Sequence, residues 1–270
     1  MSAVEAIRGE AARLLSGGQV KLVIAHGARG GRRVPLFAAD AAQAAQIVLD
    51  DDCRHNLATY LRKPEIRARF PVAVVARPAV MRSLVVLRCE SQLAPGDVLV
   101  LAAGPEEYHG VVDLPGAAAL LREHYAKVAL DPELVVRLGQ LKALSAEGRA
   151  AFWREELSRC TRCHACRAAC PGCYCTRCVA ERNQPQWIAP SPVAHGSYAW
   201  AVVRAYHQAG RCTLCGACQA ACPQGLPLML LNATLVQCVE EEFGYRSGYD
   251  VEAAPFIGSW EAKDPEGFVR

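Results

Sequence analysis

The sequence lacks three features that would point to common classes of protein. It has no run of about 18 apolar residues, the length that a membrane-spanning helix needs, and even the apolar stretch 71–79 is interrupted by Arg77. Its formal net charge of +3 is too small to predict nucleic-acid binding. No G-x-G-x-x-G fingerprint follows an expected strand, because Gly27, Gly30 and Gly31 have a different spacing.

The amino-terminal segment MSAVEAIRGEAARLL also lacks the uninterrupted apolar stretch of a secretory signal peptide. With 52% apolar residues, the 270-residue chain can bury a sizeable core. Fourteen cysteines would suggest disulfides in a secreted protein, but most of them fall between positions 160 and 222 at metal-binding spacing. Free thiolates of this kind are typical of a reducing cytosol, so we expect a soluble, cytoplasmic protein.

Two near-copies of one block, 159-RCTRCHACRAACP-171 and 211-RCTLCGACQAACP-223, are identical at ten of thirteen positions. Each has the C-x2-C-x2-C-x3-C-P spacing that holds 4Fe-4S clusters in two-cluster ferredoxins, where the fourth cysteine ligates the other cluster. We expect this fourth cysteine to start a helix that the following proline turns away. The predicted ligands of one cluster are Cys160, Cys163, Cys166 and Cys222, and those of the other are Cys212, Cys215, Cys218 and Cys170.

Structural zinc and a disulfide framework are the alternative interpretations of these blocks. Zinc takes four ligands in a tetrahedron, usually from two C-x2-C pairs, and does not require this longer run twice. We therefore predict two 4Fe-4S clusters. His164 occupies the place that Gly216 has in the second block, where it could tune the cluster potential or simply face solvent.

Residues 1–145 carry no cluster motif and predict an α/β domain, with a sheet covered by helices. Short apolar runs at 20–25, 72–76 and 97–102 have the length of buried strands, and helix-like stretches cover 4–15, 41–49, 55–63 and 80–93. Residues 146–244 predict a helix-rich, ferredoxin-like iron–sulfur domain with an insertion at 171–210. Helices are expected at 146–159, at 195–208 and from Pro227 to Glu242, before Gly244. Residues 245–270 form an extended tail in this interpretation.

Six cysteines remain outside the two ligand sets. Cys89 and Cys238 fit small buried residues on helices. Three others fall within six residues beside the cluster loops, where thiols without a metal would oxidise or bind one. We expect this trio to hold a third metal centre, another 4Fe-4S cluster or a zinc ion. Its members are Cys173, Cys175 and Cys178, with Cys53 as a distant fourth ligand just before an expected helix.

The wider chain resembles a known family. The segments 21-KLVIAHGARGGRRVPLF-37, 53-CRHNLATYL-61 and 72-VAVVARPAVMRSLVVL-87 are similar to the N-terminal domain of the beta subunits of deazaflavin-coenzyme-reducing hydrogenases and dehydrogenases. The segments 159-RCTRCHACRAACPGCYCTRC-178, 186-QWIAPSPVAHGSYAW-200 and 224-QGLPLMLLN-232 are similar to bacterial members encoded with hydrogenases, formate dehydrogenases and heterodisulfide-reductase-like flavoproteins. The resemblance covers most of residues 20–240.

The resemblance implies an electron-transfer subunit. It also implies that FAD binds to this chain, as it does to members of the family. Relatives commonly have a Pro-Cys pair before the helix that contains Arg82, whereas here Pro78 is followed by Ala79. This departure puts the family's deazaflavin reductase activity in doubt for this chain.

We therefore expect an iron–sulfur electron-transfer subunit of a cytosolic multi-subunit oxidoreductase, with no catalytic side chain of its own. Its expected partners are flavoprotein, hydrogenase, formate dehydrogenase or heterodisulfide-reductase-like subunits. One alternative is a catalytic subunit whose α/β domain binds FAD or a deazaflavin. Another is a non-redox module in which the cysteines bind zinc.

Overall fold

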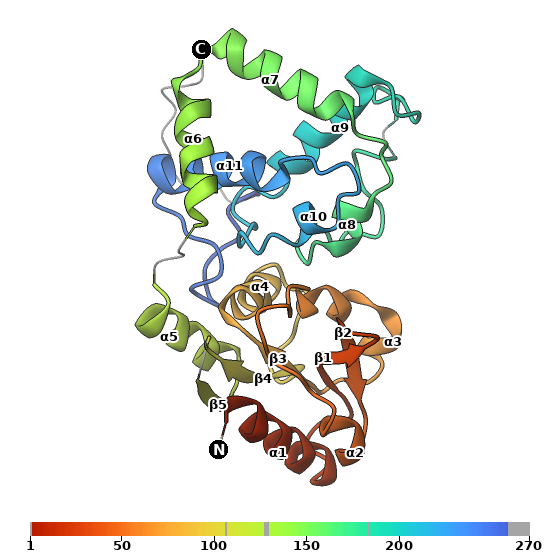
Figure 1. Cartoon of the computed structure of the whole chain (residues 1–270), viewed down its shortest axis with the longest axis vertical. Coiled ribbons are helices and arrows are strands. Elements are labelled where there is room, and N and C mark those ends of the chain that lie inside the picture. The colour runs from red at the N-terminus through yellow and green to blue at the C-terminus, as the bar shows by residue number, and fades with distance from the viewer. Residues whose placement is uncertain (1, 106, 127–129, 183, 259–270) are drawn as a thin grey trace. The chain divides into compact units, whose positions relative to one another are not determined.

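The computed structural model describes residues 2–105, 107–126, 130–182 and 184–258 (Figure 1). The chain divides into two compact units: unit 1 comprises Met1–Ala126 and Ser247–Ala254, and unit 2 comprises Lys127–Arg246 and Pro255–Arg270. Residues 130–145, which the sequence analysis grouped with the α/β domain, thus lie in unit 2, and part of the C-terminal tail lies in unit 1. Residues 259–270 of that tail lie outside the described residues.

Unit 1 is built on a five-stranded mixed sheet, which confirms the α/β class. Its strands are β1 (Val23–Arg29), β2 (Arg32–Ala38), β3 (Val72–Ala76), β4 (Val98–Ala103) and β5 (Tyr108–Val112), in the spatial order β2-β1-β3-β4-β5. The central strands β1, β3 and β4 run parallel, and the two outer strands pair antiparallel with their neighbours. All five residues of β3 are buried, as expected for a strand covered on both faces.

Helix α1 (Ala3–Ser16) covers one face of this sheet. It begins with a capping box, in which the Ser2 hydroxyl accepts from the Glu5 amide and the Glu5 side chain accepts from the Ser2 amide. Its buried residues Ile7 and Leu14 pack in one core with residues of β1, β3 and β4. The short helix α2 (Ala41–Ala44), capped by Asp40, lies against α1 on the same side (Figure 1).

The other face of the sheet is covered by helix α4 (Pro78–Cys89), which packs against β3, β4 and helix α5 (Leu114–His124). Figure 1 shows α4 and α1 on opposite sides of the strands. The 3-10 helix η1 (Leu57–Arg62) lies where a helix was expected over 55–63, and helix α3 (Pro64–Arg67) follows it. Helix α2 is also shorter than the expected 41–49, and α4 begins and ends earlier than the expected 80–93.

Both outer strands, β2 and β5, lie outside the strands predicted from the sequence. Two arginines and Pro35 interrupt the apolar pattern of β2, so the sequence does not indicate a strand there. Proline is tolerated in an edge strand where its nitrogen is on the side without a neighbouring strand, because no ladder hydrogen bond is then lost. The turn between β1 and β2 consists of Gly30 and Gly31, with φ values of 55° and 74°. Two consecutive left-handed residues form the two-residue turn that suits a twisted hairpin, which explains these glycines.

The segment 247–254 is held on unit 1 by contacts to its backbone carbonyls. The Arg82 guanidinium is buried and donates from Nε and Nη2 to the Ser247 carbonyl, at 3.2 and 2.9 Å. The Arg82 guanidinium also lies 4.8 Å from the centre of the Tyr249 ring, a cation–π contact. Cys89, which was expected to be buried, is half-buried and donates to the Asp250 carbonyl.

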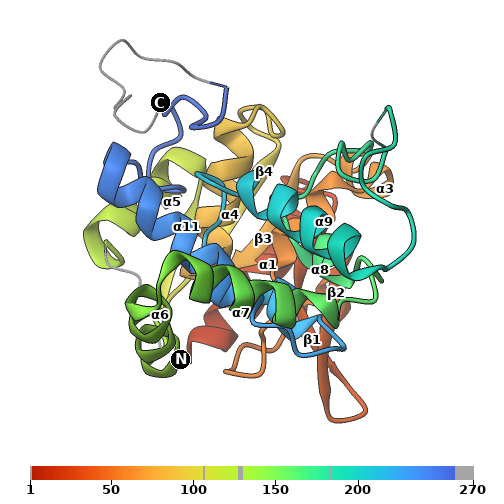
Figure 2. The same cartoon turned by 90° about the horizontal axis from the view of Figure 1, so that it is seen from above.

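Unit 2 consists of helices and connecting loops in its described part. Its longer helices are α6 (Pro132–Ala143), α7 (Ala146–Ser158), α9 (Ala194–Tyr206) and α11 (Leu228–Phe243), and its short ones are α8 (Ala165–Ala169) and α10 (Ala217–Ala220). Figures 1 and 2 show α9 beside α7 and α6 beside α11. Helix α11 ends as expected at Gly244, which adopts the left-handed conformation at φ 63°. Cys238 on this helix is exposed, so the expectation of a buried position was wrong. Among the helices formed by described residues, none is long and apolar enough to cross a membrane.

Candidate metal centre

Two pockets in unit 2 are each lined by four cysteines. The first pocket lies between Leu157, Trp200 and Leu228, and its cysteines come from the first block except for one from the second. These cysteines are Cys160, Cys163, Cys166 and Cys222. Cys163 is exposed and the other three are half-buried, so the pocket opens to solvent on one side.

The second pocket has the reciprocal composition. Three cysteines of the second block and one of the first line it, together with Gln208 and Asn232. The cysteines are Cys212, Cys215, Cys218 and Cys170. The structure thus brings together the same two groups of four that the sequence analysis assigned to two clusters; ligation of iron by them stays a prediction.

The two blocks share one backbone conformation. Arg162 and Leu214 have φ values of 52° and 56°, and two residues later His164 and Gly216 have φ values of 61° and 75°. The Arg162 and Leu214 amides each lie 3.4 Å from the sulfur of the cysteine two positions earlier, so the first cysteine of each block accepts a backbone hydrogen bond. Hydrogen bonds to sulfur favour a thiolate and tune a metal site.

Where the helices fall in these blocks corrects one expectation. Helices α8 and α10 contain the third cysteine of each block, and the fourth cysteine follows the helix instead of starting one. Cys170 has an extended conformation, with φ −86° and ψ 122°. The proline after it fits this geometry, because a residue before proline is disfavoured in the helical region.

Burial acts against ionisation of the thiols in both pockets. It raises the pKa of Cys166 to about 11 and raises the pKa values of Cys160 and Cys218 above their ordinary value. A hydrogen bond with Cys173, and then burial, raise the pKa of Cys170. The positive charge of Arg204 acts on these pKa values in the direction opposite to burial. It partly offsets the rise for Cys166, Cys170 and Cys218, so one cation favours thiolates in both pockets.

Three polar side chains near the sulfurs were not singled out from the sequence. Arg204 and Gln208 come from α9 and the loop after it, and Asn232 comes from α11; all three are buried. The Asn232 amide nitrogen lies 3.6 Å from the Cys218 sulfur. The Gln208 amide nitrogen lies 3.4 Å from the Cys173 sulfur. The sequence contains one signal that could have identified two of them. Trp200, Arg204 and Gln208 are spaced four residues apart, which places two polar side chains on an otherwise apolar helix face.

The structure gives the three cysteines of the expected third centre different surroundings. Cys173 contacts Cys170 and Gln208, Cys175 is exposed, and Cys178 packs on the apolar cluster that includes Leu157 and Trp200. Within the described parts of the chain, no group of three or more His, Cys, Asp or Glu side chains is arranged to hold a single metal ion. The third centre therefore stays a prediction.

Cys53, the expected fourth ligand of that centre, belongs to unit 1, whereas the trio belongs to unit 2. Its thiol is buried and lies 3.7 Å from the Val48 carbonyl and 3.6 Å from the Asp50 carboxylate. Burial raises the pKa of Cys53, so its surroundings favour the neutral thiol over the thiolate that a nearby helix start was expected to favour.

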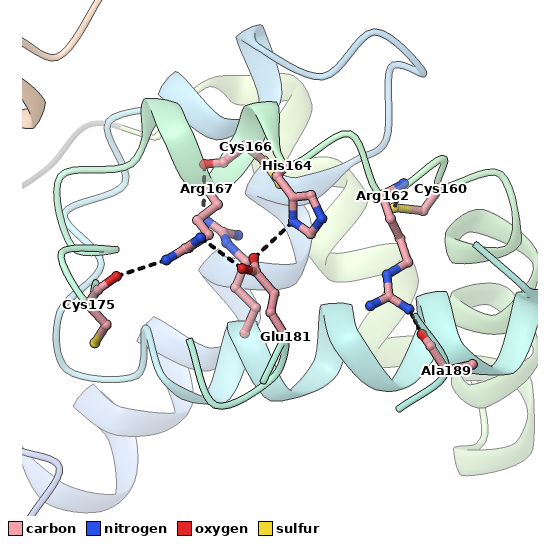
Figure 3. A network of polar contacts seen from close by, with 9 residues as sticks. Cys160, Arg162, His164, Cys166, Arg167, Cys175, Glu181 and Ala189 are labelled. Carbon is pink, nitrogen blue, oxygen red and sulfur yellow. Dashed lines mark hydrogen bonds and ion pairs between the residues drawn. The ribbon is translucent and has the colours of Figure 1, made fainter. Parts of the chain in front are cut away.

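His164 connects the first pocket to the insertion. Figure 3 shows its ring pointing toward Glu181, and the two atoms His164 Nδ1 and Glu181 Oε1 are 2.9 Å apart. Arg167 contacts the other Glu181 oxygen at 2.9 Å and donates to the Cys175 carbonyl at 2.8 Å. His164 also packs edge-on against Trp200, with ring centres 5.3 Å apart. The side chain, 40% exposed, thus joins a polar network as well as meeting solvent.

Figure 3 also shows Arg162 reaching to the Ala189 carbonyl, to which it donates a hydrogen bond. The insertion is therefore tied to the first block by His164, Arg162 and Arg167. The two arginines hold the backbone carbonyls of Cys175 and Ala189 and the carboxylate of Glu181.

Comparison with known proteins agrees with the cysteine pattern. The family described as 4Fe-4S dicluster domain matches residues 159–227. The chain is 29% identical over 108 residues to the F420-dependent formate dehydrogenase subunit beta of Methanocaldococcus jannaschii, and 32% identical over 108 residues to the F420-dependent formate dehydrogenase 1 subunit beta of Methanococcus maripaludis. Each match covers 39% of this chain and 27% of the relative, so the chain spans about a quarter of the length of these curated relatives. Residues 159–227 therefore match the 4Fe-4S dicluster domain, and the resemblance of the chain to the beta subunits of deazaflavin-coenzyme-reducing dehydrogenases is confirmed.

Proposed function

We propose that the protein is an iron–sulfur electron-transfer subunit of a multi-subunit oxidoreductase. In this proposal it passes electrons between a partner's flavin or metal site and another carrier, through two 4Fe-4S clusters. The observation that carries the proposal is the pair of pockets, each lined by three cysteines of one block and the fourth cysteine of the other. This is the ligand arrangement of two-cluster ferredoxins.

The residues of the two pockets fit such clusters. Four cysteines face each pocket, and backbone amides donate to the sulfurs of Cys160 and Cys212. The guanidinium nitrogen Nε of Arg204 is buried without a hydrogen-bond partner among the described residues, as expected beside a group that brings negative charge. When bound, 4Fe-4S clusters supply one-electron transfer, at potentials set by burial, charge and hydrogen bonds to sulfur.

The chain's own residues have three roles in this proposal. The cysteine thiolates would hold the clusters. Amide groups of the backbone and of Asn232 donate to the sulfurs, which favours extra negative charge on the site. Apolar residues such as Leu157, Trp200 and Leu228 line the first pocket and limit the access of water.

The partners are part of the proposal. Both curated relatives are named as beta subunits of formate dehydrogenases, so we propose that this chain works in a formate-dehydrogenase-like redox complex. Hydrogenase and heterodisulfide-reductase-like subunits are other partners of the same class. Fourteen free cysteines support a cytoplasmic location, because a reducing compartment keeps thiols available to metal.

Two finer assignments also remain proposals. One is a third metal centre at Cys173, Cys175 and Cys178 with Cys53 as the fourth ligand. The other is FAD bound to the α/β unit, which would make the chain a catalytic flavin- or deazaflavin-dependent subunit. A non-redox zinc module is the remaining alternative.

Metal, acid-labile sulfide and flavin analysis of anaerobically purified protein tests these possibilities together. Two clusters predict about eight irons and eight sulfides per chain, and a third cluster raises the count to about twelve. The matched variant Cys215→Ala should lose about four irons, because it removes a ligand from one pocket only. A colourless protein that contains zinc but neither iron nor sulfide would refute the proposal, and a tightly bound yellow flavin would favour the catalytic alternative.

A further inference from the structure

Helix α9 places one charged side chain, Arg204, among cysteines of both pockets. Only 6% of its surface is exposed. Arg204 interacts electrostatically with Cys166 of the first pocket, with Cys170 and Cys218 of the second, and with Cys173 of the insertion. Its Nη2 donates a hydrogen bond of 3.2 Å to the Cys166 carbonyl, which fixes the guanidinium beside the first block.

The surroundings of Arg204 leave its charge without a carboxylate. Within the described parts of the chain no Asp or Glu oxygen lies at ion-pair distance from it, and its Nε lacks a hydrogen-bond partner. A buried guanidinium cannot lose its proton, so its charge has to be compensated by nearby anions. Among the described residues, the sulfurs of the predicted cluster ligands are the groups near Arg204 that can carry this negative charge as thiolates.

We propose that Arg204 is a buried counter-cation shared by the two clusters, which raises the reduction potentials of both. The inference rests on the proposed function, because it needs clusters in both pockets. Reduction adds one electron, and so one negative charge, to a cluster that carries four thiolates; no bond is broken and no proton is moved. A fixed positive charge in a poorly hydrated site stabilises that added charge. The electron comes from a low-potential one-electron donor, which sodium dithionite replaces in the experiment.

The other arginines near the sulfurs differ from Arg204 in a way that supplies controls. Arg162 is also buried, but it lines the first pocket alone and donates to carbonyls of the insertion. Arg167 is paired with Glu181, which compensates its charge. Arg154 on α7 is exposed, so water screens its charge. Arg204 therefore differs from the other three in having both burial and interactions with thiols of both pockets.

The test measures the midpoint potentials of the two clusters by redox titration followed by electron paramagnetic resonance. In Arg204→Gln both potentials should fall by at least about 59 mV, which for a one-electron couple corresponds to a tenfold change in the reduction equilibrium. Arg162→Gln should lower only one of the two potentials, and Arg154→Gln neither. If Arg204 only tied α9 to the first block, a fall of both potentials in Arg204→Gln would not be expected.

Three results would overturn the inference: Arg204→Gln with wild-type iron content and unchanged potentials, a shift of one potential alone, or an equal shift in Arg154→Gln. If Arg204→Gln fails to bind iron, Arg204→Lys decides, because it keeps the charge. It should bind iron and keep both potentials within about 59 mV of the wild-type values, and a larger fall would contradict the inference. Wild-type protein without iron would instead refute the proposed function, so the two failures are distinguishable.

Discussion

The crossed arrangement of the fourth cysteines predicts how pairs of substitutions combine. If Cys170 serves the cluster held by the second block, removing it together with Cys215 disables one cluster. Removing Cys170 together with Cys163 disables two. The prediction follows from the pocket linings, because Cys170 and Cys215 face the same pocket and Cys163 faces the other. Counting iron therefore tests the crossing without any need to tell the two clusters apart.

The size of the effect follows from the stoichiometry of the clusters. The variants are made in a Cys173→Ser background, because Cys173 hydrogen-bonds Cys170 and could replace it as a ligand. This background also disables the proposed third centre, so it should contain about eight irons per chain. Cys170→Ala and each of the other single variants should retain about four. The Cys170/Cys215 pair should still retain about four, whereas the Cys170/Cys163 pair should retain almost none.

Iron and acid-labile sulfide are measured after anaerobic reconstitution with iron and sulfide. Far-ultraviolet circular dichroism of each variant checks that the helices of unit 2 are present. The reverse pattern, with no iron in the Cys170/Cys215 pair and about four irons in the Cys170/Cys163 pair, would refute the crossed assignment. A loss of iron that is the same for both pairs would show that the clusters do not assemble independently, which contradicts two separate pockets.

Three further outcomes are expected, two from single substitutions and one from a change of pH. Gly210→Ala should lower the thermal stability of unit 2, because the backbone φ of 69° alone costs about 1–2 kcal/mol and the new Cβ would clash with the side chain of Phe256. Asn232→Leu should lower the potential of one cluster by up to about 59 mV in a redox titration, because it removes the amide donor to Cys218. Burial lowers the pKa of His26 from 6.5 to about 4. Between these two pH values His26 is therefore neutral in the folded protein and protonated in the unfolded chain. Stability should therefore be complete above pH 6.5 and fall by roughly 3 kcal/mol as the pH drops to 4.

Each of these outcomes has a control and a result that contradicts it. Gly244→Ala has a similar φ of 63° and nothing within 4 Å of its Cβ, so equal destabilisation by both glycine variants would argue against the contact with Phe256. The second cluster is the internal control for Asn232→Leu, since its potential should not move. Hydrogen exchange of the β1 amides measures the pH effect, and a His26→Gln variant that keeps the full pH dependence would assign it to another group.

The sequence is most informative where the physical determinants are local. Cap residues such as Ser2, Asp40 and Gly244 act over one helical turn, so the starts of α1 and α2 and the end of α11 are predictable from single residues. Strands β2 and β5 were missed because each is an edge strand with a weak apolar pattern, and its pairing depends on a neighbour far along the chain. Helices α8 and α10 are too short to give a periodic signal.

Within the candidate metal centre, the cysteine spacing determines the kind of cofactor, because three thiolates at steps of three residues in one loop can reach three corners of one cluster. The environment of those sulfurs depends instead on residues from other elements. Asn232 comes from α11, and Arg204 and Gln208 come from α9 and the loop after it. Their roles follow from the packing of these elements against the two blocks, which is a long-range contact. No short pattern encodes it, because the same side chains on an exposed helix face would interact only with water.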